Sequence, residues 1–528
     1  MRIFLLILLS FPVILFSQKR KNQKDTSSIL SQPNRIEFEL TKDRSEFFVV
    51  SGDTDGILVI EQIEGGSLNG GGNWKLHMVD TAFNLKWSRE EAVPSDGNLL
   101  GYDYFGGKFF LLFSKNRFRS EELIVLELNA ESKENAVYEI TTVFPVSISH
   151  FESVGETLLI GGYANFRPVV ITYNIHDKKP RVVPGFYDGK NDVLDIVVDK
   201  DSKFFTVILS ERMRNKKSTV RVKTFTEKGD LVQDNLLNPG EKKSLLDGAS
   251  TTFANGLQYL AGTHSRKSPL YSQGFYLSKF INGTQQFNKY YAFADLNNFF
   301  NHMKPKKENR IKNRIERKKE KGKVKRFNYR LLVHKILKKG DNYVMIAEAY
   351  YPRYSYGNTG TSFRPTSFSG FGNRNTGRGN QSFNPDFLGY KYTHAVVLGF
   401  DVNCNIVWDH TFKIEDKQSF SLDENVVVSG DGQKIVLTYL EENEIRSKVV
   451  DGGEIVEGRT FNPVKLSFLA DELKSKDPQV EGIEKWYGDT MFAYGVQNIK
   501  NENGVAGKVY RKVFYLNKIR FDLNREVN

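Results

Sequence analysis

A short turn-and-strand motif recurs eight times along the 528-residue chain and sharply limits the folds that it can adopt. In each copy, a turn rich in Gly, Asp or Asn is followed directly by a run of β-forming residues. Such turns tolerate the positive φ values of tight hairpins, and the runs are typical of strands. Most successive turns lie 47 to 56 residues apart, and each of the two longer intervals contains an insertion. The copies lie at 51–62, 104–114, 153–163, 199–209, 253–263, 338–350, 429–440 and 486–496.

A second hairpin follows within each repeat and is clearest at 77–91 and 398–412. In both segments an Asp is followed four residues later by Asn, five later by an aliphatic residue and seven later by Trp. Weaker versions lie at 223–233 and 449–458. Each repeat therefore predicts four strands joined as a meander, and a unit of roughly 45 residues repeated seven or eight times is typical of a β-propeller. The two clear copies are Asp80, Asn84, Leu85, Trp87 and Asp401, Asn405, Ile406, Trp408.

The repeats predict an all-β chain in which residues 35–528 form a single β-propeller. The last repeat supplies three strands and ends at 508–522, whereas 35–41 is an unpaired strand near the start. We expect these two segments to share a blade and close the ring. This gives eight blades, with seven as the alternative. Two stacked β-sandwiches are a further alternative, although sandwiches need not repeat the turn-strand unit so evenly.

The Asp…Asn-aliphatic-x-Trp hairpin resembles the repeat of quinoprotein-type propellers. The turn and strand SGDGQKIVLTYL at 429–440 is similar to the corresponding element of TolB-type propellers. The quinoprotein resemblance implies eight blades, in a family whose members include pyrroloquinoline-quinone enzymes and a non-enzymatic scaffold of the outer-membrane assembly machinery. Only two repeats here carry the Trp, so we assign no cofactor site and expect no cofactor.

Residues 1–17 are expected to form a secretory signal peptide, because Arg2 precedes an apolar run that ends at Phe16 and a polar stretch follows. The run is shorter than the ~20 residues of a membrane span, so we expect no transmembrane span. Residues 18–34 are expected to form a flexible segment ahead of the first strand. A retained anchor is the alternative, because positive charges follow the run at once. The LFSQ ending resembles that of exported proteins from Bacteroidota-type Gram-negative bacteria. The flanking charges are Lys19, Arg20, Lys21 and Lys24.

The first insertion, 292–328, contains most of the net charge of the chain. Residues 304–326 hold 13 Lys or Arg and 3 Glu, a net +10 against +12 for the whole chain. The segment predicts a helix, which is either a solvated charged arm or a docking element for an anionic partner. An apolar patch before it, Leu296, Phe299, Phe300 and Met303, is expected to pack against the propeller. The candidate partner-binding residues are Lys304, Lys306, Lys307, Arg310, Lys312, Arg314, Arg317, Lys318 and Lys319.

The second insertion, 352–390, is rich in Gly, Asn, Arg and aromatic residues and cannot build a core. Its composition fits either a tolerated surface loop or a segment that stacks on sugars or nucleobases, or that folds on a protein partner. A meander places both insertions on the same face of the ring, at the sixth blade. Shorter basic loops at 114–120, 211–217 and 264–268 share that face. The candidate partner-binding residues of this insertion are Arg353, Arg364, Arg374 and Arg378.

Sequence signatures of enzymes are missing. The chain has no HExxH motif, no GxSxG elbow, no phosphate-binding loop and no clustered Cys and His, so we expect no catalytic or metal-binding residues. Cys404 is the single cysteine, which excludes an intramolecular disulfide. A pair of carboxylates in the central channel would leave no trace in the sequence.

The sequence therefore predicts a non-catalytic, exported interaction scaffold. Its basic, insertion-bearing face is expected to dock onto an outer-membrane or periplasmic protein complex, or onto another acidic partner of the envelope. The protein is expected in the periplasm, held at the outer membrane by that partner, with no intracellular nucleic acid as a ligand. Two alternatives stay open: a glycan-binding or glycan-processing propeller that uses the central channel, and a protein that binds an anionic glycan or lipid.

Overall fold

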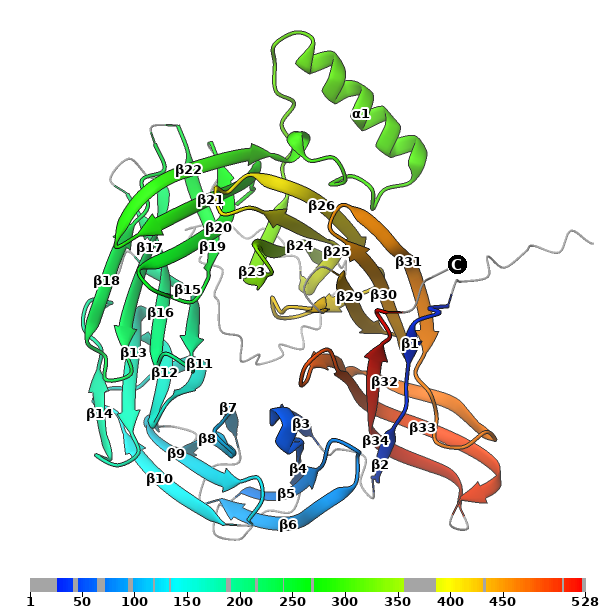
Figure 1. The fold of residues 1–528 in the computed structure, drawn as a ribbon. Helices are drawn as coiled ribbons and strands as arrows, with labels where there is room; N and C mark the ends of the chain where they lie inside the picture. The colour runs from blue at the N-terminus through cyan, green and yellow to red at the C-terminus, as the bar shows by residue number, and fades with distance from the viewer. Residues whose placement is uncertain are drawn as a thin grey trace, which may run out of the picture.

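In a computed structural model of the chain, eight antiparallel sheets surround a common axis and form an eight-bladed β-propeller (Figure 1). This confirms the predicted all-β fold and the count of eight blades. Among the residues that the structure describes, no helix is both long and apolar enough to cross a membrane. The described residues are 26–40, 46–63, 72–93, 98–116, 119–132, 134–186, 191–213, 217–240, 242–266, 270–355, 386–430, 434–505 and 508–524.

Each blade runs from an inner strand A to an outer strand D. Blade 1 consists of β3 (Phe47–Ser51), β4 (Ile57–Ile63), β5 (Gly72–Val79) and β6 (Leu85–Val93). Blade 2 consists of β7 (Leu99–Phe105), β8 (Lys108–Asn116), β9 (Arg119–Asn129) and β10 (Asn135–Thr141). Blade 3 consists of β11 (Ser147–Val154), β12 (Thr157–Ala164), β13 (Arg167–Asn174) and β14 (Lys179–Val182), and blade 4 of β15 (Asn191–Asp199), β16 (Phe204–Arg212), β17 (Ser218–Thr226) and β18 (Leu231–Leu236).

The second half of the ring follows the same order, and short strands are added at blades 6 and 8. Blade 5 consists of β19 (Ser244–Ser250), β20 (Leu257–Ser265), β21 (Gly274–Ile281) and β22 (Thr284–Ala292). Blade 6 consists of β23 (Arg330–Lys339), β24 (Asn342–Ser355), β25 (Asp386–Phe400) and β26 (Ile406–Lys413), with the added strand β27 (Gln418–Ser419). Blade 7 consists of β28 (Val427–Ser429), β29 (Lys434–Glu441), β30 (Glu444–Asp451) and β31 (Glu454–Pro463), and blade 8 of β32 (Asp471–Lys485), β33 (Met491–Val505), β34 (Lys508–Phe521) and β2 (Arg35–Glu39), with the added strand β1 (Leu30–Ser31).

The eight turn-and-strand motifs of the sequence form the A–B hairpins of the eight blades. At Gly155 and Gly488 the turn backbone has φ values of 57° and 52°, which glycine adopts at little cost because it has no Cβ. In a meander the A–B and C–D turns lie on one face of the ring and the B–C and D–A connections on the other. We call the first the turn face and the second the insertion face.

The Asp and Asn of the second hairpin motif close a C–D turn. In blade 1, Oδ1 of Asp80 accepts hydrogen bonds from the backbone N–H groups of Ala82 and Asn84, both at 2.8 Å. Asp401 accepts the equivalent pair in blade 6, at 2.9 and 2.8 Å. These bonds hold Phe83 at a positive φ of 66°, which is uncommon for a bulky residue. The motif is thus explained by the local geometry of the turn.

Two Trp side chains, Trp87 and Trp486, form hydrogen bonds to neighbouring blades. Nε1 of Trp87 in blade 1 donates to the carbonyl oxygen of Ala130 in blade 2, at 3.2 Å. Nε1 of Trp486 in blade 8 donates to the carbonyl oxygen of Gly56 in blade 1, at 3.3 Å. The apolar core also lies between blades, in clusters that take side chains from facing sheets. Each fully buried large apolar side chain stabilises the fold by about 1.5–3 kcal/mol, so the ring is held by these inter-blade layers.

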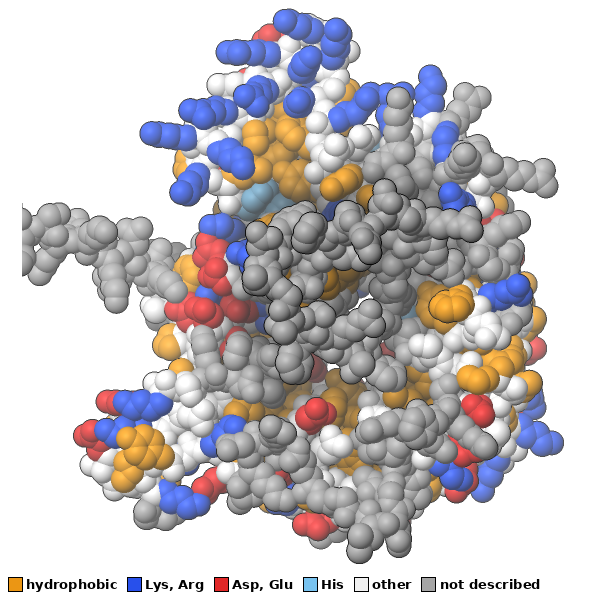
Figure 2. Space-filling model, turned by 180° about the vertical axis from the view of Figure 1, so that it is seen from behind, with side chains coloured by type: hydrophobic (Ala, Val, Ile, Leu, Met, Phe, Trp, Pro, Cys, Tyr) orange, Lys and Arg blue, Asp and Glu red, His pale blue; other side chains and the backbone are white. Residues whose placement is uncertain are grey.

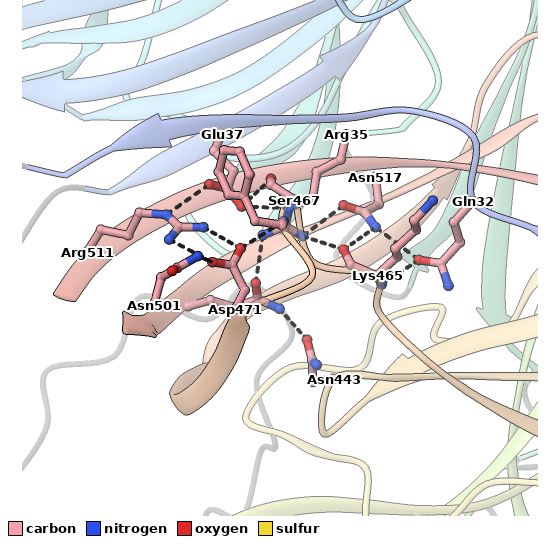
Figure 3. Close-up of polar contacts among 12 residues, drawn as sticks. Gln32, Arg35, Glu37, Asn443, Lys465, Ser467, Asp471, Asn501, Arg511 and Asn517 are labelled. Carbon is pink, nitrogen blue, oxygen red and sulfur yellow. Dashed lines mark hydrogen bonds and ion pairs between the residues drawn. The ribbon is translucent and has the colours of Figure 1, made fainter. Parts of the chain in front are cut away.

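Both ends of the chain build blade 8, as the sequence predicted. β2 pairs with β34 from Arg35↔Asn517 to Glu39↔Val513. β1 adds the pairs Leu30↔Phe521 and Ser31↔Arg520, so the ring begins ahead of the predicted boundary at residue 35. A buried polar network ties β2 to the other strands (Figure 3). In it, Arg35 donates to Gln497 and Asn517, both at 2.8 Å.

The first insertion contains α1 (Pro305–Lys319), which projects from the rim of the ring (Figure 1). The predicted helix over 304–326 is therefore shorter than expected. It stops because Gly322 adopts a φ of 61°, and the N–H of Lys323 bonds back to the carbonyl oxygen of Lys318 at 2.8 Å, an arrangement that ends helices. The apolar patch before α1 packs into the core between blades 5 and 6, as predicted.

The second insertion is shorter than the predicted 352–390. β24 and β25 continue as a paired hairpin up to Ser355↔Asp386, and β27 pairs with Tyr390 and Lys391. The predicted loop boundaries are therefore wrong at both ends, because residues on each side of the Gly-rich stretch extend the B–C hairpin. Residues 356–385 lie outside the described part of the chain.

Candidate functional site

The exposed side of α1 is the first candidate site. Figure 2 shows Lys and Arg side chains covering the helix, with apolar side chains between it and the ring. The apolar side is fixed by Ile315, which is 8% exposed, and by the partly buried Ile311. The remaining helix surface carries the cations, so its orientation follows from the burial of these two residues.

The cations of α1 form almost no ion pairs with carboxylates in the described part of the chain. Lys312 pairs with Glu308 at 2.7 Å, one helical turn away. The other candidate residues of the helix are exposed and form no ion pair with any described carboxylate. Lys306, Arg310 and Arg314 follow one another at four-residue spacing, where like charges destabilise a helix by about 0.2–0.5 kcal/mol per pair. An anionic partner would relieve this repulsion.

The segment that leads into α1 is anchored to blade 6 by Asp409 of β26. Its carboxylate accepts hydrogen bonds from the backbone N–H groups of Asn297 and Asn298, at 3.0 and 2.7 Å. The hydroxyl of Thr411 donates to the carbonyl oxygen of Asn298 at 2.7 Å. These bonds fix the base of the insertion, so α1 is presented from a rigid support.

A stacked pair of histidines lies at the same base. The rings of His302 and His394 are nearly parallel, with centroids 3.6 Å apart. Burial lowers the pKa of His302 to about 4. Burial, and then the neighbouring His302, lower the pKa of His394 well below its usual value. Both rings are therefore neutral at neutral pH, which is the state in which they can stack.

The candidate residues of the second insertion are only partly described. Arg353 lies on β24 and donates to the side chain of Gln418 at 3.1 Å. It shares the insertion face with α1 because the B–C hairpin and the D–A connection open on the same side. Arg364, Arg374 and Arg378 lie outside the described residues. Of the short basic loops, Lys115 is paired with Glu139 at 2.6 Å.

A second candidate site lies around the axis, where carboxyl groups on several inner strands have raised pKa values. Burial raises the pKa of Glu152 on β11 and of Glu484 on β32 to about 7. Burial raises the pKa of Asp195 on β15 to about 6, and the charge of Asp247 on β19 adds to the effect. Carboxyl groups that are partly protonated near neutral pH are typical of functional sites, although structural networks also produce them.

Asp195 and Asp247 share their surroundings with His334 of β23. Asp247 accepts hydrogen bonds from the N–H groups of Val333, at 2.7 Å, and Gly248, at 2.9 Å. His334 lies 3.6 Å from Glu348, whose side chain is fully buried. Burial would lower the pKa of His334, but the Glu348 carboxylate outweighs it and raises that pKa. The three strands thus bring two acids and a histidine together.

None of the site residues predicted from the sequence lies at the axis. One signal was present: a Leu-Asp pair occurs in the inner strands of two successive repeats, at Leu194-Asp195 and Leu246-Asp247. In both strands the register shifts at this point, between Val193 and Asp195 and between Leu245 and Asp247. No group of three or more His, Cys, Asp or Glu suited to a metal ion occurs among the described residues.

The chain matches no family model, and it matches no curated protein. Among solved structures it is similar to the acylaminoacyl peptidase of Pyrococcus horikoshii (9% identity, 76% of this chain and 51% of that chain, TM-score 0.35). It is also similar to the β-propeller domain of the Trilobed protease from Pyrococcus furiosus (8% identity, 80% of this chain and 95% of that chain, TM-score 0.33). A third similar structure is polysaccharide lyase Uly1 (10% identity, 93% of this chain and 100% of that chain, TM-score 0.38). The chain thus spans about half the length of the first of these proteins. Likenesses this distant assign no activity.

Proposed function

We propose that the protein is a non-catalytic interaction scaffold, exported to the cell envelope, whose insertion face docks onto an acidic surface of an outer-membrane or periplasmic protein complex. One observation carries the proposal: α1 is anchored on its apolar side, while its exposed cations pair with no described carboxylate except through Lys312. A fixed array of positive charge attracts and orients an acidic partner.

The rigid base of α1 supports docking rather than simple solubility. A solubilising arm needs no fixed orientation, whereas here Asp409 and the apolar patch hold the start of the insertion against blade 6. Because the cations lie on one element, their charges sum over one surface. We therefore expect binding that weakens as salt concentration rises, since exposed charges are screened over about 8–10 Å at physiological ionic strength.

The test compares the wild type with a neutral-helix variant in which seven exposed cations of α1 become Gln. Gln has a helix propensity close to those of Lys and Arg, so the helix is expected to persist. Tagged proteins are purified from detergent-solubilised native membranes, and the co-eluting proteins are quantified. A stoichiometric partner that is lost in the variant supports the scaffold. The substitutions are Lys306→Gln, Lys307→Gln, Arg310→Gln, Arg314→Gln, Arg317→Gln, Lys318→Gln and Lys319→Gln.

A control for the position of the charges, which removes three cations rather than seven, changes exposed lysines of the turn face, Lys179, Lys228 and Lys338, to Gln. Each lies in a strand or turn near that face and forms no ion pair with a described residue. The control is expected to keep the partner. Loss of the partner in both variants would indicate a general charge effect, and a wild-type protein that elutes alone would contradict the proposal.

The axial carboxyl groups favour a second candidate function, the binding or processing of a glycan near the axis. Its supporting observation is the raised pKa of carboxyl groups on β11, β15, β19 and β32. Under this alternative, glycan-array binding is lost in Asp195→Asn or Asp247→Asn and is kept in the neutral-helix variant. The opposite pattern supports the scaffold.

A further inference from the structure

Three polar side chains form a cluster on the turn face, where blade 8 meets blade 1. Tyr487 lies in the A–B turn between β32 and β33, and Lys518 and Arg520 lie near the end of β34. Lys518 is 4% exposed, Tyr487 is half-buried and Arg520 is exposed. The cluster lies on the face opposite to the D–A connection that carries α1, so it is independent of the docking surface proposed above.

The phenol oxygen of Tyr487 accepts hydrogen bonds from both cations. Nζ of Lys518 donates to it at 2.5 Å and also donates to the carbonyl oxygen of Thr81 in blade 1, at 2.6 Å. Nη2 of Arg520 donates to the same phenol oxygen at 3.2 Å. The ammonium group further lies 5.3 Å from the ring centroid of Trp486. The positions of all three groups are therefore fixed relative to one another.

No described carboxylate lies within ion-pair distance of the two cations of the cluster, Lys518 and Arg520. The other buried cations of blade 8 differ, because Arg35 pairs with Glu37 and Arg511 pairs with Asp471. A buried charge without an opposite charge is costly. The buried ammonium of Lys518 is thus satisfied by neutral oxygens alone.

The hydroxyl of Tyr487 can still donate a hydrogen bond. Its oxygen already accepts from two cations, so its hydrogen points elsewhere and is available for donation. Burial would raise the pKa of Tyr487, but the hydrogen bonds from Lys518 and Arg520 outweigh it and lower that pKa. The cluster therefore presents donors and positive charge, with no acceptor of its own.

We propose that Tyr487, Lys518 and Arg520 form a binding site for an oxyanion, such as a sulfate or carboxylate group. Hydrogen bonds to a charged acceptor are shorter and stronger than neutral ones, and planar Arg groups suit such acceptors well. The anion accepts from the Tyr487 hydroxyl and from the free donors of Arg520, and it supplies the charge that Lys518 lacks. It is either a free ion or a group on an acidic polymer.

The test uses the tyrosinate absorbance of Tyr487, obtained as the difference between wild type and Tyr487→Phe. The difference is expected to titrate below the ordinary tyrosine pKa of about 10. Sodium sulfate, compared with sodium chloride at equal ionic strength, is expected to move this titration to higher pH, because a bound anion disfavours a second negative charge on the phenol. The coupling is reciprocal, so sulfate must bind more weakly once Tyr487 is ionised.

Sulfate affinity, measured by calorimetry, is expected to fall on the order of tenfold in Arg520→Gln, since a hydrogen bond to a charged group is lost. Arg266→Gln, an exposed change on the insertion face, is the matched control and is expected to leave the affinity unchanged. Arg520 is exposed, so its substitution tests binding without disturbing the core. Tyr487→Phe supplies an independent variant that lacks the donated hydroxyl.

The source of the anion is separated by comparing inorganic sulfate with dextran sulfate and uncharged dextran. The comparison is made with the neutral-helix variant, so that binding of the polymer to α1 does not contribute. Much tighter binding of dextran sulfate assigns the site to a polymer, and equal binding per sulfate assigns it to a free ion. A tyrosinate titration that sulfate does not move, together with equal affinity in Arg520→Gln, would overturn the proposal without affecting the role proposed for α1.

Discussion

The guanidinium of Arg511 and the carboxylate of Asp471 form a two-point ion pair within blade 8, with N–O distances of 3.0 and 2.5 Å (Figure 3). Their side chains are 6% and 0% exposed. Arg511 belongs to β34 and also lies 3.3 Å from Glu37 of β2, the strand that closes the ring. The pair therefore links the inner strand of blade 8, through β34, to the N-terminal strand.

Asp471→Asn is expected to destabilise the protein by about 1.5–3 kcal/mol, because the buried guanidinium loses its two-point partner and keeps only the single contact with Glu37. Chemical denaturation measures the change. Glu39→Gln is the matched control: Glu39 pairs with Lys508 at the surface of the same blade, with side chains 45% and 55% exposed, and such pairs contribute at most about 1 kcal/mol. Equal losses in the two variants would show that Asp471 does not close the ring.

The same carboxylate predicts an acid sensitivity. Burial would raise the pKa of Asp471, but hydrogen bonds from Arg511 and Asn501 outweigh it and lower that pKa. A lowered pKa means that the stabilisation is present above the unfolded value of about 3.9 and is lost as the pH falls through the folded value. The difference in the free energy of unfolding between the wild type and Asp471→Asn should shrink as the pH falls below about 4. A constant difference down to lower pH would be inconsistent with this assignment.

The stacked His302 and His394 predict a second pH effect at the base of α1. Their pKa values are lowered on folding, so the unfolded chain binds more protons below its usual histidine pKa of about 6.5. Stability should therefore fall as the pH drops from about 6.5 toward 4. Lys307 and Lys413 act in the same direction at His302, and Glu308 opposes them.

His302→Phe keeps an aromatic ring in the stack and removes one titrating group. We expect it to reduce the loss of stability between pH 6.5 and 4, as followed by thermal unfolding. The protection of the backbone amides of residues 297–303 against hydrogen exchange, relative to their intrinsic rates, should also become less dependent on pH. If the profile of the variant matches that of the wild type, the histidine pair does not control the anchoring of the insertion.

The buried carboxyl group of Asp195 predicts that its replacement by a neutral side chain stabilises the fold at neutral pH, as measured by thermal unfolding. Burial raises the pKa of Asp195 to about 6, above the unfolded value of about 3.9, so this group stabilises the fold at low pH and loses that contribution as the pH rises through 6. Asp195→Asn should stabilise the protein at pH 7 by about 1–2 kcal/mol, after solvent screening, and by less at pH 4. A destabilised variant at pH 7 would show that the carboxylate is needed structurally.

The prediction of the fold from sequence succeeded because its signal is local and repeated. Turn glycines such as Gly155 and Gly488 adopt positive φ, and a run of β-forming residues follows them, so every A–B hairpin is visible in the sequence. The closure of blade 8 was also predictable, because one strand was missing at the end and one was spare at the start. The Asp80 and Asp401 motif was visible as well, and the structure shows that its Asp closes the C–D turn.

The sites were harder to predict because they form between distant segments. The cations of α1 were evident as a charge cluster, but their anchoring depends on Asp409, about a hundred residues away. Asp195, Asp247 and His334 come from three blades, and Tyr487, Lys518 and Thr81 come from opposite ends of the chain. Burial, which sets the pKa values of these groups, depends on neighbours that the sequence does not place.

The most direct measurement for the scaffold is site-specific photo-crosslinking in living cells of the source organism. A photoreactive residue replaces Arg314 on α1 or, as the control, Lys228 on the turn face. Docking through α1 predicts one predominant crosslinked envelope protein from position 314, lost when the other six cations of the neutral-helix variant are changed to Gln, and none of it from position 228. An equal yield from both positions, or a crosslink that persists without those charges, would contradict docking through α1.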